Sequence, residues 1–228
     1  MAKKNNAKKA SDEVIIEDYG KKSLVDIFEE KKDVITYGLI GLFIVVGGYL
    51  LYRQMVQQPK AKAAIEQIAK AQFQFEQDSF ALALTNPGDG FPGFLDIISD
   101  YSGTATGNLA LYYAGISYLN LGQFDAAIDY LKDFSPCGDV TPSMRAGALG
   151  DAYSEKSDFA EALSYYNKAV RNTDNGLIAA YYLKKVGMLN EKQGNKDAAR
   201  EAYQTIKDKY FNTPMAGDIE KYLIRVAG

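Results

Sequence analysis

The chain has 228 residues, and 47% of them are hydrophobic, so it can bury a sizeable core. This composition excludes disorder of the whole chain. The sequence has no His and one Cys, which excludes Cys/His zinc sites, Ser/His and Cys/His nucleophile systems, and an internal disulfide. With 26 Lys and Arg against 29 Asp and Glu, the formal net charge is -3, so no basic field of the whole chain recruits nucleic acid.

A segment near the N-terminus, residues 34–52, carries no charged residue. At about 1.5 Å per residue, its length as a helix matches the ~30 Å hydrocarbon layer of a bilayer. A cleaved signal peptide is the alternative, but its apolar region would be shorter and a small-residue cleavage site would follow, whereas Arg53 and Gln54 follow here. We therefore predict a retained transmembrane helix over residues 34–52.

The leader before this segment, residues 1–33, holds eight Lys, while the 20 residues after the segment hold four Lys or Arg. This bias predicts a cytoplasmic leader and a translocated C-terminal part. The first dozen residues are expected to be disordered, and residues 23–30 either form a short amphipathic helix or continue the membrane helix. Within the span, Gly41 and Gly48 share one face and are candidates for packing against another membrane helix.

The remainder of the chain is dense in Ala, Tyr and Leu at three- and four-residue spacing, which predicts an almost entirely helical domain. Three similar phrases, each typical of a helical hairpin, begin at Asn108, Arg145 and Tyr181. A small residue where two helices would cross recurs at intervals of 35 and 37 residues, at Gly115, Gly150 and Gly187. These intervals lie close to the ~34-residue period of the tetratricopeptide repeat. The first two phrases each have two aromatic residues after this small residue, Tyr118 with Phe124 and Tyr153 with Phe159. In the third phrase Asn190 and Lys196 stand at the corresponding positions, as expected where a solenoid ends.

The predicted fold is therefore all-α, with one transmembrane helix, a tetratricopeptide α-solenoid and a C-terminal capping helix. Residues 53–107 are expected to hold linking helices and a turn-rich loop, residues 108–213 three hairpins, and residues 214–228 the cap. We expect one helix to begin at Pro59 and to carry Ile65, Ile68, Phe73 and Phe80. The cap places one apolar stripe against the repeats: Ile219, Tyr222, Leu223 and Val226.

In a solenoid of this kind, the first helix of each hairpin lines the concave surface. Positions flanking the small crossing residue are therefore candidates for a partner-binding groove: Leu109, Tyr112, Ile116, Met144, Gly147, Asp151, Tyr181, Lys184 and Met188. This mixture of apolar and charged side chains suits peptide segments bound with modest selectivity. Side chains at such positions can also be merely solvated, and the aromatic residues of the repeats are expected to be core.

No phosphate-binding loop, paired-carboxylate motif or metal-ligand spacing occurs in the sequence. We therefore predict a protein that is not an enzyme and that uses no metal, no cofactor and no small-molecule substrate. The single thiol, Cys137, lies in a turn between repeats without a basic cluster beside it, and we expect it to be inert.

The order of these parts resembles the YfgM type of single-pass tetratricopeptide-repeat protein, in its form from Bacteroidetes-like bacteria. The resemblance covers about residues 31–226. It rests on the leader, the span, an Ala-rich helix and four phrases: DSFALAL from Asp78, GFLDII from Gly93, GNLALYYAGISYLNLGQF from Gly107 and DIEKYLIR from Asp218. It implies an inner-membrane protein with a periplasmic domain, attached to the SecYEG translocon. It further implies work alongside a PpiD-type periplasmic chaperone and contact with emerging polypeptides.

Two alternatives stay open from the residues themselves. The first is an adaptor with the same fold that serves cell-envelope assembly or division, with partners unrelated to the translocon. The second is the reverse topology, with cytosolic repeats that receive soluble factors, because the lysine bias across the span is modest.

Overall fold

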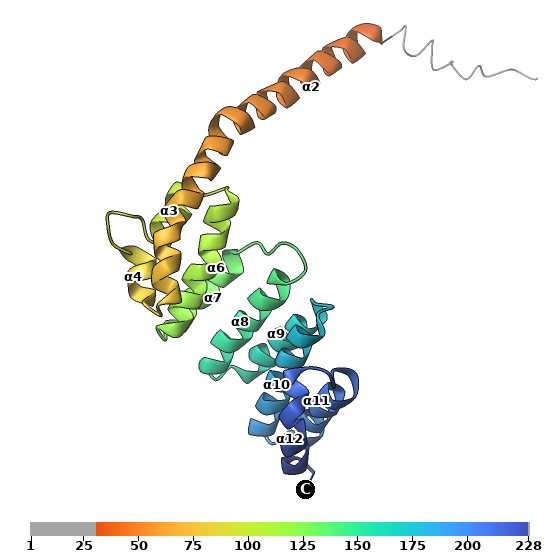
Figure 1. The fold of residues 1–228 in the computed structure, drawn as a ribbon. Coiled ribbons are helices and arrows are strands. Elements are labelled where there is room, and N and C mark those ends of the chain that lie inside the picture. Colours follow the sequence, from red (N-terminus) through yellow and green to blue (C-terminus); the bar gives the residue numbers. More distant parts are fainter. Residues whose placement is uncertain (1–30, 228) are drawn as a thin grey trace, which may run out of the picture. The chain divides into compact units, whose positions relative to one another are not determined.

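A computed structural model describes residues 31–227 of the chain (Figure 1). They fall into two compact units, the first ending at Arg53 and the second beginning at Gln54. Every regular element among the described residues is a helix, which confirms the predicted all-α class. The disorder predicted for the first dozen residues and the helix predicted over residues 23–30 lie outside the described residues.

The first unit contains helix α2, Lys32–Tyr52, and none of its residues is buried. The helical stretch Lys32–Glu76 holds the one segment of the described chain that is long and apolar enough to cross a membrane. No other atom of the structure lies within 4 Å of where a Cβ would stand on Gly41 or Gly48. Their role in packing against another membrane helix stays a prediction.

A π-helical segment covers Arg53–Gln57, and the second unit continues with α3, Gln58–Glu76, and α4, Phe80–Thr85. The prediction of one helix from Pro59 through Phe80 is wrong, because the chain turns after Glu76. Asp78 takes a left-handed φ of 55°, and the amide of Ser79 donates to the carbonyl of Gln74 at 2.9 Å. This hydrogen-bond pattern closes a helix C-terminus, so Phe80 lies on a separate helix.

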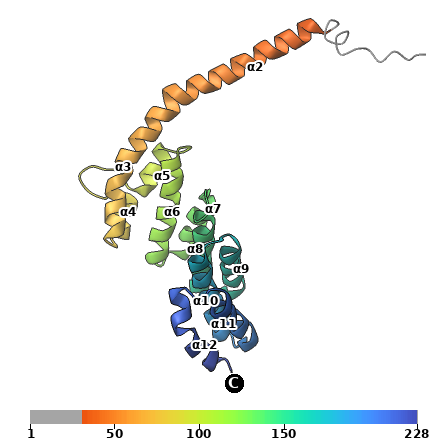
Figure 2. The same cartoon turned by 45° about the vertical axis from the view of Figure 1, so that its right-hand side comes forward.

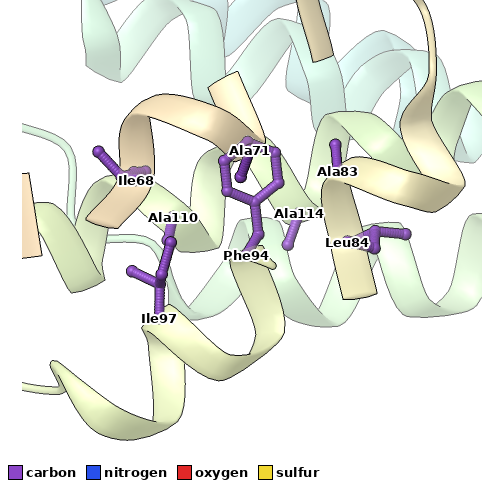
Figure 3. Packing of buried hydrophobic residues seen from close by; sticks show 8 residues of the cluster. All are labelled: Ile68, Ala71, Ala83, Leu84, Phe94, Ile97, Ala110 and Ala114. Carbon is purple, nitrogen blue, oxygen red and sulfur yellow. The ribbon is translucent and has the colours of Figure 1, made fainter. Parts of the chain in front are cut away.

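One buried cluster joins the helices at the start of the second unit. It connects α3 and α4 to α5, Phe94–Asp100, and to α6, Ala105–Asn120. Figure 3 shows its side chains gathered from these four helices: Ile68, Ala71, Ala83, Leu84, Phe94, Ile97, Ala110 and Ala114. The rings of Phe94 and Tyr113 stack beside it with centroids 5.1 Å apart. Burial of these apolar groups fixes the short helices α4 and α5, which are too short to be stable alone.

Three helical hairpins follow in the described part of the chain. Their first helices, called the A helices, are α6, α8 at Thr141–Glu155 and α10 at Gly176–Lys192. Their second helices, called the B helices, are α7 at Phe124–Asp133, α9 at Phe159–Arg171 and α11 at Lys196–Lys209. Each A helix packs against the B helix that follows it, and α8 and α10 also pack against the preceding B helix, so the hairpins stack in chain order (Figures 1 and 2).

The recurring glycines lie where the two helices of a hairpin cross. A Cβ on each would stand within 2.6 Å of a side chain on the following B helix, and that side chain comes sixteen residues later in every hairpin. The pairs are Gly115 with Leu131, Gly150 with Tyr166, and Gly187 with Tyr203. The repeat period of the sequence therefore has a direct steric cause.

The C-terminal segment consists of a 3-10 helix, η2 at Pro214–Asp218, and the short helix α12 at Ile219–Arg225. Ile219 and Val226 are buried in a cluster with Tyr203 and Ile206 of α11. The segment η2 contacts α10, and α12 packs on α11. Together, η2 and α12 therefore cover the last hairpin in the way that an A helix covers the hairpin before it.

Two ion pairs between the C-terminal segment and α10 span about one repeat period. Lys184 pairs with Asp218 at 2.8 Å, and Arg225 pairs with Glu191 at 2.7 Å, each across 34 residues. The Arg225 guanidinium, helped by the Tyr203 hydroxyl, holds the pKa of Glu191 below its usual value. We therefore describe η2 and α12 as a half repeat that covers the end of the stack.

Candidate functional site

A groove of about 650 Å³ opens along the A helices, at the end where each leads into its B helix. Its volume lies within the ~300–1,000 Å³ usual for ligand sites. All three A helices, the first residue of α7 and Tyr166 of α9 contribute to its lining. The lining residues are Leu119, Asn120, Gly122, Phe124, Asp151, Ser154, Glu155, Tyr166, Lys185, Met188, Leu189 and Lys192. We call this surface the groove.

A hydrogen-bonded network occupies one part of the groove. Asp151 of α8 accepts from the Tyr166 hydroxyl at 2.7 Å and from the Lys185 ammonium at 2.5 Å. The ammonium also lies over two rings, with its nitrogen 5.6 Å from the centroid of Tyr166 and 5.1 Å from that of Tyr181. The network ties α8, α9 and α10 together, and it neutralises the Asp151 charge inside the protein.

Three tyrosines are influenced by this carboxylate: Tyr112, Tyr166 and Tyr182. Burial raises the pKa of Tyr112 to about 12, and the charges of Tyr113 and Asp151 add to the effect. Burial and the Asp151 carboxylate also raise the pKa values of Tyr166 and Tyr182. All three hydroxyls therefore stay protonated at neutral pH.

The structure places the sequence-predicted groove residues in different surroundings. Asp151 and Met188 line the groove. Tyr112 and Ile116 are half-buried and pack against the core cluster between α7 and α8. Other candidates are exposed on the A helices but outside the groove lining: Leu109, Met144 and Tyr181. The role of all these residues in binding stays a prediction.

Two of the predicted positions need correction. Gly147 is buried, because the ring of Tyr182 lies over it and a Cβ there would stand 2.0 Å from that ring. It offers no surface to a ligand and serves the contact between α8 and α10. Lys184 faces the half repeat, where its ammonium pairs with Asp218 and lies 4.5 Å from the centroid of Tyr222. Its neighbour Lys185 holds the groove position instead.

Several lining residues, Lys185 and Lys192 among them, are not among the positions predicted from the sequence. The predicted positions lie at constant offsets from the crossing glycines, whose second interval is two residues longer than the first. Contacts between α8 and α10 instead follow shorter intervals, 34 residues for Asp151 with Lys185 and 35 for Gly147 with Tyr182. A helical stripe through residues 181, 185, 188 and 192 is the signal that could have found them.

Two other features bear on chemistry. Cys137 is exposed, and its amide donates to the Thr141 hydroxyl at 2.8 Å. Within residues 31–227, no group of three Cys, Asp or Glu side chains is placed to hold a metal ion.

Family models described as tetratricopeptide repeat match three segments, residues 109–135, 147–174 and 185–211. These segments fall on the hairpins α6–α7, α8–α9 and α10–α11. A comparison with curated proteins found no match. The described chain is thus all-helical, with tetratricopeptide repeats, one long apolar helix near the N-terminus and a short C-terminal helix. Tetratricopeptide repeats are generally modules for protein-protein interaction, so the partners expected for this chain are proteins.

Proposed function

We propose that this protein is a membrane-anchored scaffold of the bacterial inner membrane, a non-enzymatic, chaperone-like accessory of the SecYEG translocon. Its repeat domain holds client or partner polypeptides in the groove, and a PpiD-type chaperone is among its partners. The translocon and the chaperone come from the resemblance of the sequence to the YfgM type. The groove is the observation that carries the binding role.

The groove offers apolar contact to a bound polypeptide. Met188 is 47% exposed, and Leu119 and Phe124 line the same cavity. Methionine adapts its shape to different partners because its side chain is unbranched and polarizable. The Asp151 carboxylate is already held by Tyr166 and Lys185. Such a surface suits binding of polypeptide segments.

The membrane part of the proposal rests on α2 and on the lysine bias across it. Its apolar length supports a single span. Eight Lys in the leader against four Lys or Arg after the span favour a cytoplasmic leader and a periplasmic repeat domain.

Photocrosslinking in living cells tests this function. A photoreactive amino acid at position 188 should form adducts with translocon subunits, a PpiD-like chaperone or emerging envelope proteins, identified by mass spectrometry of solubilised membranes. The matched control is position 201 on α11, where Glu201 is exposed outside the groove, and it should give none of these adducts.

Other results would replace this proposal. Adducts confined to cytosolic factors would reverse the topology, and adducts only to division or cell-wall proteins would favour an envelope adaptor. The exposed Cys137 checks orientation in the same cells, because an impermeant maleimide should label it only when the repeat domain is periplasmic and the outer membrane is permeabilised. Labelling of the solubilised, unfolded chain is the positive control.

A further inference from the structure

Two of the helices that line the groove carry opposite charges there. Helix α8 supplies Asp151 and Glu155, which are four residues apart and lie on one face. Helix α10 supplies Lys185 and Lys192, which are seven residues apart and also share a face. The lining from α8 is therefore acidic and the lining from α10 basic.

The two pairs of charges differ in what they contact. Asp151 and Lys185 neutralise each other at 2.5 Å and are both largely covered. Glu155 and Lys192 are exposed, and neither forms an ion pair with another described residue. The Lys192 ammonium lies 4.7 Å from the centroid of the Phe159 ring, and this contact limits its movement while leaving the charge unneutralised. The groove thus presents one acidic side chain, Glu155, and one basic side chain, Lys192, that have no ionic partner among the described residues.

Apolar surface lies in the same cavity as these charges. Met188 is one turn from Lys192 on α10, and Leu119 and Phe124 belong to the first hairpin. A segment bound there must bring an apolar side chain to Met188, a basic group to Glu155 and an acidic group to Lys192. A uniformly basic or uniformly acidic segment would satisfy one helix and be repelled by the other.

We propose that the preferred occupant of the groove is an amphipathic helix of a partner protein, with basic residues on one flank of its apolar stripe and acidic residues on the other. This inference rests on the proposed function, because it specifies the chemistry of the polypeptide that the groove holds. A helix provides the required arrangement, since residues three and four apart flank a common stripe.

The test uses the full chain in detergent micelles and three fluorescent helical peptides with one shared apolar stripe. Their flanks are basic and acidic in the first peptide, all basic in the second and all acidic in the third. Binding is measured by fluorescence anisotropy with the wild type and with Glu155→Lys, Lys192→Glu and the double variant. Glu201→Lys and Lys209→Glu on α11 are controls with the same charge changes outside the groove.

The wild type should bind the mixed peptide about threefold to tenfold more tightly than the other two, the range expected for exposed charge pairs and their repulsive counterparts. Glu155→Lys should shift the preference to the acidic peptide and Lys192→Glu to the basic peptide. The double variant should regain the preference for the mixed peptide, while the α11 controls should behave as the wild type. High salt should weaken every preference.

Two outcomes overturn the inference in distinguishable ways. Equal binding of the three peptides by the wild type and all variants would refute charge selection while leaving polypeptide binding in the groove intact. Failure of the wild type to bind any of the peptides would count against both this inference and the proposed function.

Discussion

Replacing Gly187 with Ala is expected to lower the free energy of unfolding of the repeat domain by about 2 kcal/mol, within the range of overpacked cores. A Cβ at this position would stand 2.2 Å from the ring of Tyr203. That ring is fully buried in the cluster that joins α11 to the half repeat, and its hydroxyl donates to Glu191 at 2.9 Å. The ring cannot move aside without disturbing both contacts. The higher helix propensity of Ala, about 1 kcal/mol, offsets only part of this loss.

The matched control is Gly217→Ala, because the added Cβ would meet no side chain or other element within 4 Å and the backbone there is not left-handed. Its unfolding curve should lie at or slightly above that of the wild type. Both variants are compared by denaturant unfolding of the full chain in detergent, followed by circular dichroism. Coincident curves for Gly187→Ala and the wild type would show that α10 and α11 do not cross as closely as described.

Alkaline pH should destabilise the repeat domain strongly, and Tyr112 should be one of several tyrosines that contribute to the effect. Its pKa is about 12 in the folded protein, against 10.0 in its unperturbed form. Because the folded-state pKa is raised, this stability is fully present below pH 10 and is lost as the pH rises toward 12. Two pKa units correspond to about 3 kcal/mol. The raised pKa values of Tyr166 and Tyr182 act in the same direction.

The measurement is a pH titration that follows tyrosinate absorbance and circular dichroism together. We expect a group of tyrosines that ionise only as helicity is lost. Tyr112→Phe keeps a ring beside Phe134, whose centroid lies 5.3 Å from that of Tyr112, but removes the ionisable group. Stability of this variant should fall less steeply above pH 10. An identical slope in both proteins would disprove the role of Tyr112.

Much of the fold could be predicted from the sequence because the repeat is enforced by close contact. Gly115, Gly150 and Gly187 each pack under a side chain of the next helix, so their recurrence marks the hairpins directly. The break between α3 and α4 gave no comparable signal. Asp78 takes the left-handed position that glycine usually holds after a helix, and the surrounding residues favour a continuous helix.

The groove was harder to predict because its surface depends on how neighbouring repeats are offset. Lys184 and Lys185 are adjacent in sequence, yet the first faces Asp218 and the second faces Asp151. One residue of register therefore decides which lysine belongs to the groove. Likewise, only the position of the Tyr182 ring shows that Gly147 is covered.

The most direct measurement of the central claim is binding of a fluorescently labelled, permanently unfolded polypeptide to the full chain in detergent, with Met188→Asp compared against Met144→Asp. Both methionines are exposed on A helices, but only Met188 lines the groove. Because a buried charge opposes apolar contact, Met188→Asp should weaken binding by about tenfold or more. Met144→Asp should bind as the wild type does, and both variants should keep the same thermal melting curve. Undiminished binding by folded Met188→Asp would contradict the account, because the polypeptide would then bind outside the groove.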